Sequence, residues 1–234
     1  MYFDNVILGG NFTIINGRIV TDGGEMAKGK KIDRKKTGDA SNLEKILIDS
    51  RFANVNISVS NLSKEVEVHL YGEANVDGDV DFDVRIVNSE LRIKLKSSGN
   101  CYISNLKLDV TVPQKTFKVI CVNSASGNIK VSEKVSTEQL EIKTKSGSVE
   151  TRAMFTNASI TTMSGDVDFF ANATKDIRVE ISTMSGDISA KFNNIGHLNL
   201  HANSMSGDIT NCHKGIGYTA DVNASAMSGD INVW

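Results

Sequence analysis

Apolar and polar residues alternate with a period of two along most of the chain. Residues 177–192 read IRVEISTMSGDISAKF, with an apolar residue or threonine at every second position up to Thr183 and an apolar residue again from Ile188. This period is typical of β-strands with one buried face. Thr183 and Ile188 lie five positions apart, so one residue must interrupt the alternation if both face inward. The Ser185-Gly186 step predicts that interruption, because glycine readily adopts positive φ.

The same turn recurs along the rest of the sequence. It reads TMSGDV at 162–167 and returns as TMSGDI, SMSGDI and AMSGDI, after earlier relatives SASGNI and TKSGSV. The glycines of these six copies follow one another at intervals of 18–22 residues, and two weaker copies are centred on Gly78 and Gly99. We predict structural turns in the four best copies at Ser164, Gly165, Ser185, Gly186, Ser206, Gly207, Ser228 and Gly229.

A repeat of about 21 residues that contains short strands predicts an all-β fold, a β-solenoid or β-helix-like stack of coils. A step of 21 residues places Leu198 beside Ile177 and Leu200 beside Val179, and a further step of 22 reaches Ala220 and Val222. Apolar columns would then run through the stack. Eight coils, each rising about 4.8 Å, would form a rod about 35–40 Å long.

Three segments follow from these patterns. Residues 1–42 hold a hairpin signal at Asn16-Gly17 and then a stretch rich in glycine and lysine, which predicts an exposed connection. Residues 43–70 carry alternating strand patterns and are predicted to form a β-rich cap over the open end of the stack. Residues 71–234 are predicted to form the repeat stack, and no helix is predicted.

Composition narrows the classes of protein to which the chain can belong. It has 234 residues, 40% hydrophobic and 23% charged, with a net charge of −2, which predicts a globular protein without a general attraction to nucleic acid. The basic run at 28–36 lacks interleaved aromatic residues, so we interpret it as a solvated connection. The three cysteines, Cys101, Cys121 and Cys212, show no metal-binding or disulfide spacing.

Neither a membrane span nor a signal peptide is predicted. No run approaches the ~20 apolar residues that a spanning helix needs. The first 17 residues are interrupted by Asp4 and by glycines and lack a basic region at their start. The expectation is therefore a cytoplasmic protein, with the cell surface as the alternative if a leader has been removed.

The segments IDSRFANVNISVS (48–60) and EVEVHLYG (65–72), followed by recurrent SGDI or SGDV, resemble a bacterial family of β-strand repeats named putative adhesins. The sequence is also similar to autotransporter-adhesin-like head domains, and the resemblance covers roughly residues 43–234. It implies an all-β stack with a role in adhesion or surface interaction, and it implies no catalytic residues.

Aspartates follow the corners in a row. Neighbouring carboxylates ~5 Å apart repel by about 1 kcal/mol in water, so something should offset the repulsion. A ladder of cations such as calcium is one interpretation. The favoured alternative is that each aspartate accepts a hydrogen bond from the backbone of its own turn. The candidates are Asp166, Asp187, Asp208 and Asp230.

Methionines precede the corners in a second row. Alternation places them on the outward phase, where they would form an adaptable apolar contact stripe. The bend that follows them favours the other interpretation, an inward ladder of stacked core side chains. The residues are Met163, Met184, Met205 and Met227.

Other candidate chemistry is weaker. His197 and His201 point outward together, one predicted coil away from Asp176 and Glu180, but residues four apart on a strand are ~13 Å apart and cannot share one metal ion. Near-identical acidic copies could also belong to a polysaccharide-processing enzyme. Such a site needs different groups at one place, and regular repetition does not supply them. We therefore predict no catalytic residues and no cofactor.

The sequence thus predicts a non-enzymatic, adhesin-like module that binds a protein or glycan partner. The alternative is a scaffold that self-associates through the ends of the stack. The final SGDINVW carries no polar capping segment, which predicts that the last repeat in the sequence is an adhesive edge.

Overall fold

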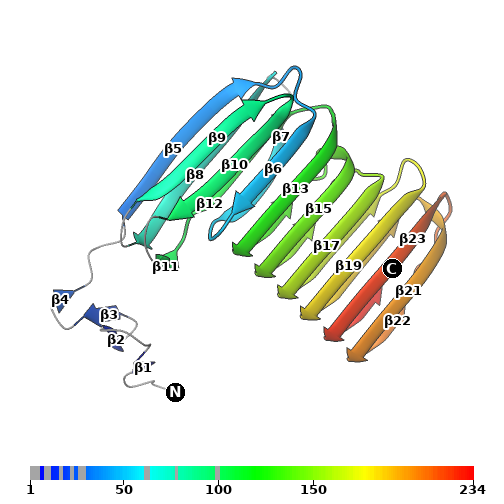
Figure 1. The fold of residues 1–234 in the computed structure, drawn as a ribbon. Helices are drawn as coiled ribbons and strands as arrows, with labels where there is room; N and C mark the ends of the chain where they lie inside the picture. The colour runs from blue at the N-terminus through cyan, green and yellow to red at the C-terminus, as the bar shows by residue number, and fades with distance from the viewer. Residues whose placement is uncertain are drawn as a thin grey trace.

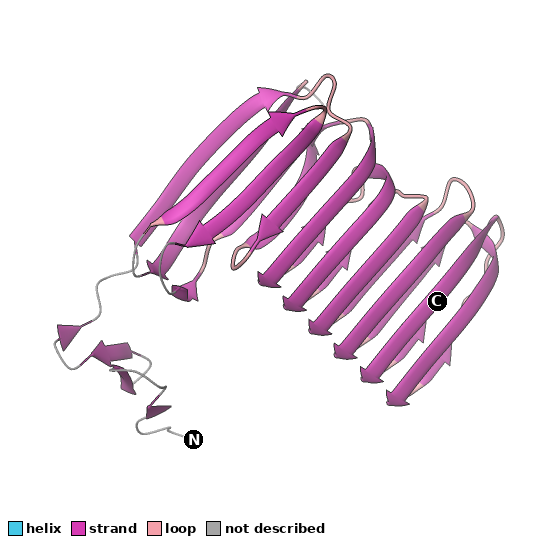
Figure 2. Cartoon of the chain, viewed as in Figure 1, coloured by secondary structure: helices cyan, strands magenta, loops and turns pink. Residues whose placement is uncertain are grey.

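The computed structural model describes residues 6–7, 12–15, 18–21, 24–25, 30–60, 64–76, 79–97 and 101–234. In these residues the protein consists of strands joined by loops, and no helix occurs (Figure 2). Two large sheets carry the fold, and a separate four-stranded antiparallel sheet lies near the N-terminus (Figure 1). The all-β prediction is confirmed.

Sheet I contains nine strands. Their spatial order is β21 (Ile195–Ser206), β23 (Tyr218–Ser228), β19 (Ile177–Ser185), β17 (Asn157–Ser164), β15 (Ser136–Ser146), β13 (Thr116–Ser126), β6 (Lys45–Ser50), β10 (Glu90–Ser97) and β9 (Val80–Val87). From β21 to β10 every pair is parallel, and β10 pairs with β9 antiparallel.

Sheet II contains eleven strands. Ten follow the order β11 (Cys101–Ser104), β8 (Glu65–Val76), β12 (Lys107–Pro113), β7 (Asn54–Ser60), β14 (Ile129–Val131), β16 (Val149–Thr151), β18 (Val167–Asn172), β20 (Ile188–Asn193), β24 (Ile231–Val233) and β22 (Ile209–Asn211). The remaining strand, β5 (Lys30–Asp39), pairs with β8. The small N-terminal sheet consists of β1 (Val6–Ile7), β2 (Phe12–Ile15), β3 (Arg18–Thr21) and β4 (Gly24–Glu25).

The chain passes back and forth between the two sheets. From β13 onward each odd-numbered strand lies in sheet I, and the even-numbered strand that follows it lies in sheet II. We call one such pair of strands a layer. Inward residues repeat in register from layer to layer, and side chains such as Val179, Ile181 and Ile188 are buried in a single apolar core. The alternation in the sequence therefore reflects one face packed against the opposite sheet.

The C-terminal layers do not stack in sequence order. β23 lies between β19 and β21, and β24 lies between β20 and β22. Ile177 therefore neighbours Ala220, and Ala220 neighbours Leu198. The predicted direct contact between Ile177 and Leu198 is wrong. The predicted adhesive last repeat is also wrong, because Ile231–Val233 is enclosed between β20 and β22, and the outermost layer is β21–β22.

The inward residues of the two layers explain this order. β23 offers Ala220, Val222, Ala224 and Ala226 to the core, and all four are buried. The outer layer has Ser204 in the column of Ala226 and Asn211 in the column of Val233. Burying those polar side chains deep in the stack would cost free energy unless each found a hydrogen-bond partner. The more polar repeat therefore lies at the end.

The N-terminal region is also more integrated than predicted. β6 and β7, predicted as a cap, form a layer inside the stack, because β6 pairs parallel with β10 and β13 and β7 pairs parallel with β12 and β14. β9 pairs antiparallel with β10, and β8 pairs antiparallel with β12. The regular parallel layers therefore do not begin at residue 71, contrary to the prediction. Gly78 and Gly99, the centres of the weaker copies, lie outside the described residues.

The basic run is mostly a strand and not a solvated connection. β5 carries Lys30 to Lys36 and pairs with β8 along its length. The Arg34 guanidinium donates to the Val80 carbonyl at 2.6 Å, and the Lys36 ammonium donates to the Phe82 carbonyl at 3.1 Å. These bonds tie β5 of sheet II to β9 of sheet I. Lys28 and the Asn16-Gly17 turn lie outside the described residues, although β2 and β3 on either side of that turn pair antiparallel.

Candidate functional site

The Ser-Gly corners form one continuous edge of the molecule, where the chain leaves sheet I for sheet II. Each corner glycine has a positive φ, between 124° at Gly127 and 150° at Gly207. The corners also stack very closely. A Cβ on Gly186 would lie 2.4 Å from the Gly165 carbonyl oxygen, and a Cβ on Gly229 would lie 2.1 Å from that of Gly186. Both the left-handed conformation and the lack of space require glycine.

The corner aspartates form a hydrogen-bonded ladder. The Asp187 amide donates to Asp166 Oδ1 at 2.9 Å, the Asp230 amide to Asp187 Oδ1 at 2.8 Å, and the Asp208 amide to Asp230 Oδ1 at 2.8 Å. Asp166, Asp187 and Asp230 therefore each accept from the next layer, and not from the backbone of their own turn as expected. These bonds place a partial positive charge beside three of the four carboxylates and offset the repulsion within the row.

The same ladder continues with asparagine in earlier layers. Asn54 Oδ1 accepts from the Asn128 amide at 2.8 Å, and Asn128 Oδ1 accepts from the Ser148 amide at 3.0 Å. Neutral and charged side chains thus perform the same structural role. Within the described residues, no group of three or more His, Cys, Asp or Glu side chains is arranged to hold a metal ion. The cation ladder stays a prediction.

The methionine row faces solvent. Its members lie on four neighbouring strands of sheet I, in the spatial order Met163, Met184, Met227 and Met205. Their exposed fractions are 49%, 48%, 49% and 76%. The favoured interpretation, an inward core ladder, is wrong, because the chain keeps its alternation up to the methionine and bends only at the serine and glycine. We call this row the methionine stripe.

A row of buried hydroxyl-bearing residues precedes the corners, and two of its members lie directly behind methionines of the stripe. Ser124, Thr144, Thr162 and Thr183 are buried one position before the outward residue of their layers. Thr144 Oγ1 donates to the Ser146 carbonyl at 3.2 Å, but Thr162 Oγ1 and Thr183 Oγ1 have no hydrogen-bond partner. These two buried hydroxyls reduce stability, and the sequence pattern alone did not single them out.

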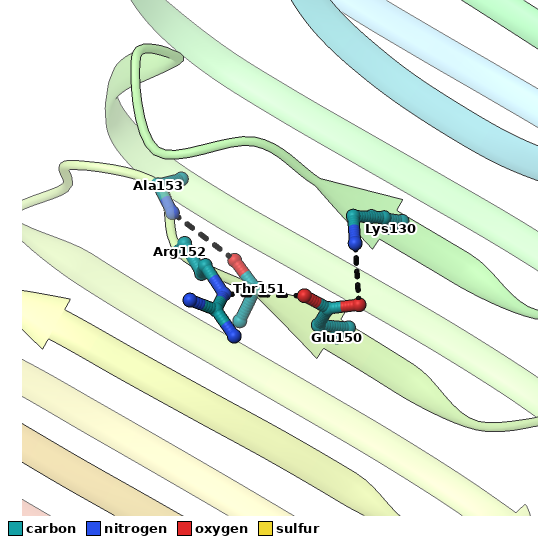
Figure 3. A network of polar contacts seen from close by, with 5 residues as sticks. All are labelled: Lys130, Glu150, Thr151, Arg152 and Ala153. Atoms are coloured by element: carbon teal, nitrogen blue, oxygen red, sulfur yellow. Dashed lines mark hydrogen bonds and ion pairs between the residues drawn. The ribbon is translucent and has the colours of Figure 1, made fainter.

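A charged cluster lies on sheet II beyond the corner (Figure 3). Glu150 accepts from the Lys130 ammonium at 2.7 Å and from Arg152 Nε at 3.1 Å, and the Ala153 amide lies 3.5 Å from Thr151 Oγ1. The hydrogen bond from Lys130, followed by the charge of Lys130 and then the contacts with Arg152, lowers the pKa of Glu150 below its usual value although partial burial opposes this.

An open hollow of about 450 Å³ lies beside this cluster, lined among others by Asn128, Ser148, Asp166 and Asp168. Its polar lining comes from outward positions of β14, β16 and β18 and from the residue that precedes each of these strands. The hollow was not predicted from the sequence, because those positions differ in residue type from one copy to the next. The signal that could have found it is the alternation itself, which places residues 128, 130, 148, 150, 166 and 168 on one face.

The histidines do not form the patch that the sequence suggested. His197 and His201 neighbour Thr219 and Asn223 of β23, because β23 separates them from Asp176 and Glu180. Asp176 instead accepts from the Thr219 amide at 2.8 Å. Cys121 and Cys212 are free thiols, and burial followed by the nearby charge of Glu141 raises the pKa of Cys121.

Comparison with known proteins gives the family. A model described as Toastrack DUF4097 matches residues 43–234. The chain belongs to the Toastrack DUF4097 family. A search of curated proteins found no match. The resemblance seen in the sequence is thereby confirmed as far as an all-β family with parallel sheets.

Two solved structures have a fold similar to that of this chain. A putative cell adhesion protein from Clostridium sporogenes has a TM-score of 0.54 and 14% identity, and the match covers 87% of this chain and 99% of that one. A putative adhesin from Bacteroides fragilis has a TM-score of 0.53 and 15% identity, and the match covers 89% of this chain and 100% of that one. At these identities the similarity shows the fold alone. No helix in the described residues of this Toastrack chain is long and apolar enough to cross a membrane.

Proposed function

We propose that the protein is a non-enzymatic binding module that uses the methionine stripe to hold an extended segment of a protein partner. In this proposal the layers behave as the coils of a β-solenoid and the SGDI and SGDV corners are their repeating unit, as in the autotransporter-adhesin-like heads that the sequence resembles. The observation that carries the proposal is the exposure of four methionines in one row. Two proteins of similar fold bear the names putative cell adhesion protein and putative adhesin, which agrees with a binding role.

The stripe has the dimensions of a peptide site. Four strands at a spacing of about 4.8 Å place the outer two methionines about 14 Å apart, which matches four to five residues of an extended chain. Methionine side chains are unbranched and polarisable, so they adapt to apolar partners of different shape. Exposed apolar side chains gathered in one row are typical of interaction sites.

The corner beneath the stripe is rigid. Glycine carbonyls pack against the next layer with no room for a Cβ, and the ladder bonds the aspartate amide of one turn to the aspartate side chain of the neighbouring turn. Flexible side chains therefore stand on a fixed backbone. This arrangement lowers the conformational entropy that binding must remove while it leaves the contact surface adaptable.

A protein partner fits the stripe better than a glycan does. Glycans are recognised mainly through hydrogen bonds, whereas the methionine side chains offer only weak acceptors. The polar hollow beside Glu150 is a surface that would suit a glycan better than the stripe does. The two partner classes can therefore be separated by the surface that they require.

The test is a selection of displayed random peptides on the immobilised protein, with binding affinities measured for the enriched sequences. We expect the variant Met163→Ser, Met184→Ser, Met227→Ser to lose at least about tenfold in affinity, since each removes buried apolar contact. The control Val87→Ser removes another exposed apolar side chain, far along sheet I, and should bind as the wild type does.

Enriched peptides that bind the triple variant and the wild type equally well contradict the proposal. So does a selection that enriches none. A glycan array run in parallel identifies the other partner class, and binding there that depends on Glu150 but not on the methionines would replace the proposal with a glycan site.

A further inference from the structure

The outer layer β21–β22 is an open end of both sheets. β21 pairs with β23 on one side, and β22 pairs with β24 on one side. Within the described part of the chain, no strand pairs with the other side of either. Such an edge presents backbone N–H and C=O groups that can accept another strand.

The end face is also partly apolar. Ile209 is 46% exposed, whereas Ile231 and Ile188, its counterparts in the next two layers, are fully buried. Leu198 and Leu200 pack against the core but are only partly buried, and Ser204 and Asn211 add polar, neutral groups around them. A mixture of apolar and neutral polar side chains is typical of interfaces that form and dissociate.

Charge distinguishes the two ends of the molecule. β21 and β22 contain no Lys, Arg, Asp or Glu. At the opposite end, β5 reads KKIDRKKTGD and β9 reads VDFDVRIV, so both strands carry several charges. Charged side chains on an edge strand prevent pairing with other chains, and only the N-terminal end has this protection.

We propose that the end face β21–β22 binds the same face of a second copy, to form a closed two-fold dimer. A rotation of 180° about an axis perpendicular to the sheets brings β21 against its copy antiparallel and β22 against its copy in the same way. Both sheets then continue across the interface. Assembly of one end on the other would instead place the uncharged edge against the charged strands β5 and β9, so a filament is disfavoured.

The size of the end face is sufficient for a specific dimer. β21 has 12 residues, so the face is about 40 Å long, and two packed sheets with their outer side chains are about 20 Å across. Each partner would bury roughly 800 Å², which together is the size of a standard specific interface. Met205 of the methionine stripe lies on β21, whereas the other three methionines lie on β17, β19 and β23. The dimer test changes none of the four methionines and the peptide test changes only the other three, so either proposal can fail without the other.

The experiment measures the molar mass of the purified full chain by light scattering over a concentration series. We expect the mass to rise with concentration and to level off at twice the 25.3 kDa mass of the chain. The variant His201→Lys, Asn203→Lys adds charge at two exposed positions of β21 without touching the core. In a two-fold interface these charges lie near their own copies, so we expect the dissociation constant to rise at least about tenfold.

The control is Ser159→Lys, Thr161→Lys on β17, in the same outward columns three strands away from the end. It should dimerise as the wild type does. A wild type that stays monomeric at every concentration, a mass that grows past two copies, or equal dimerisation of the β21 variant overturns the proposal. Circular dichroism melting of each variant shows whether a loss of dimer reflects a loss of folding.

Discussion

The order of the C-terminal layers gives a sharp test of the fold. Arg178 on β19 lies opposite Asp221 on β23, and Asp221 lies opposite Asn199 on β21. One strand spacing, about 4.8 Å, separates Arg178 from Asp221, and two spacings, about 9.6 Å, separate Arg178 from Asn199. A disulfide requires Cα atoms within about 7 Å. We therefore expect Arg178→Cys, Asp221→Cys to crosslink and Arg178→Cys, Asn199→Cys to remain reduced.

The stability change can also be estimated. Residues 178 and 221 are 43 positions apart, and closing a loop of that length in the unfolded chain removes entropy worth up to about 4 kcal/mol. In a protein of this size, a stabilisation of about 4 kcal/mol raises the melting temperature by about 8–16 °C. All three positions are outward, so the cysteines should not disturb the core.

The assay replaces the three native cysteines by serine, oxidises each double variant and measures its free thiols and its melting temperature with and without reductant. Asn199→Cys, Asp221→Cys is a second positive case, because these residues are also direct neighbours. Efficient crosslinking of residues 178 and 199, with none between 178 and 221, would show that the layers stack in sequence order and would refute the reasoning.

Three further substitutions test the corner and its surroundings. Gly186→Ala should lower the free energy of unfolding by about 3 kcal/mol or more in urea titrations, because φ is +140° and the new Cβ would lie 2.4 Å from the Gly165 oxygen. Ser185→Ala at the same corner should change that free energy by less than about 0.5 kcal/mol. Equal effects of the two substitutions would contradict the account. Thr183→Val should stabilise the protein by about 1 kcal/mol because it removes a buried hydroxyl without a partner. Thr144→Val should destabilise it by a similar amount because it breaks the hydrogen bond to the Ser146 carbonyl. If both substitutions shift the melting temperature in the same direction, this account is wrong. Glu150→Gln should cost up to about 1 kcal/mol at pH 7, since the folded-state pKa of Glu150 is lowered and its contribution is present above the unfolded value of 4.5. That cost should shrink as the pH falls below 4.5 and vanish once the pH is below the lowered folded-state pKa. A cost that persists in urea titrations at still lower pH would exclude the ion pairs as its source.

Local features of the fold were predictable from the sequence. The inward positions of β19 and β20, the corner at Gly186 and the absence of helices in the described residues follow from alternation and from the needs of a tight turn. The methionine stripe was not predicted correctly, because the side that a residue next to a bend faces depends on where the alternation breaks. The strand β5 was missed since its outward positions are almost all charged, and its pairing with β8 involves residues far away in the sequence.

The sequence by itself determined the period of the repeat, the face of each strand that is buried and the residues at which the chain turns, because each of these depends on neighbours a few positions away. Only the tertiary structure decided the order of the layers. Every repeat presents the same columns, so Ile177 is compatible with Leu198 or with Ala220 at its side. The choice was made by the whole stack, which buries the apolar layer β23–β24 and leaves Ser204 and Asn211 at the end, where they need no buried partner.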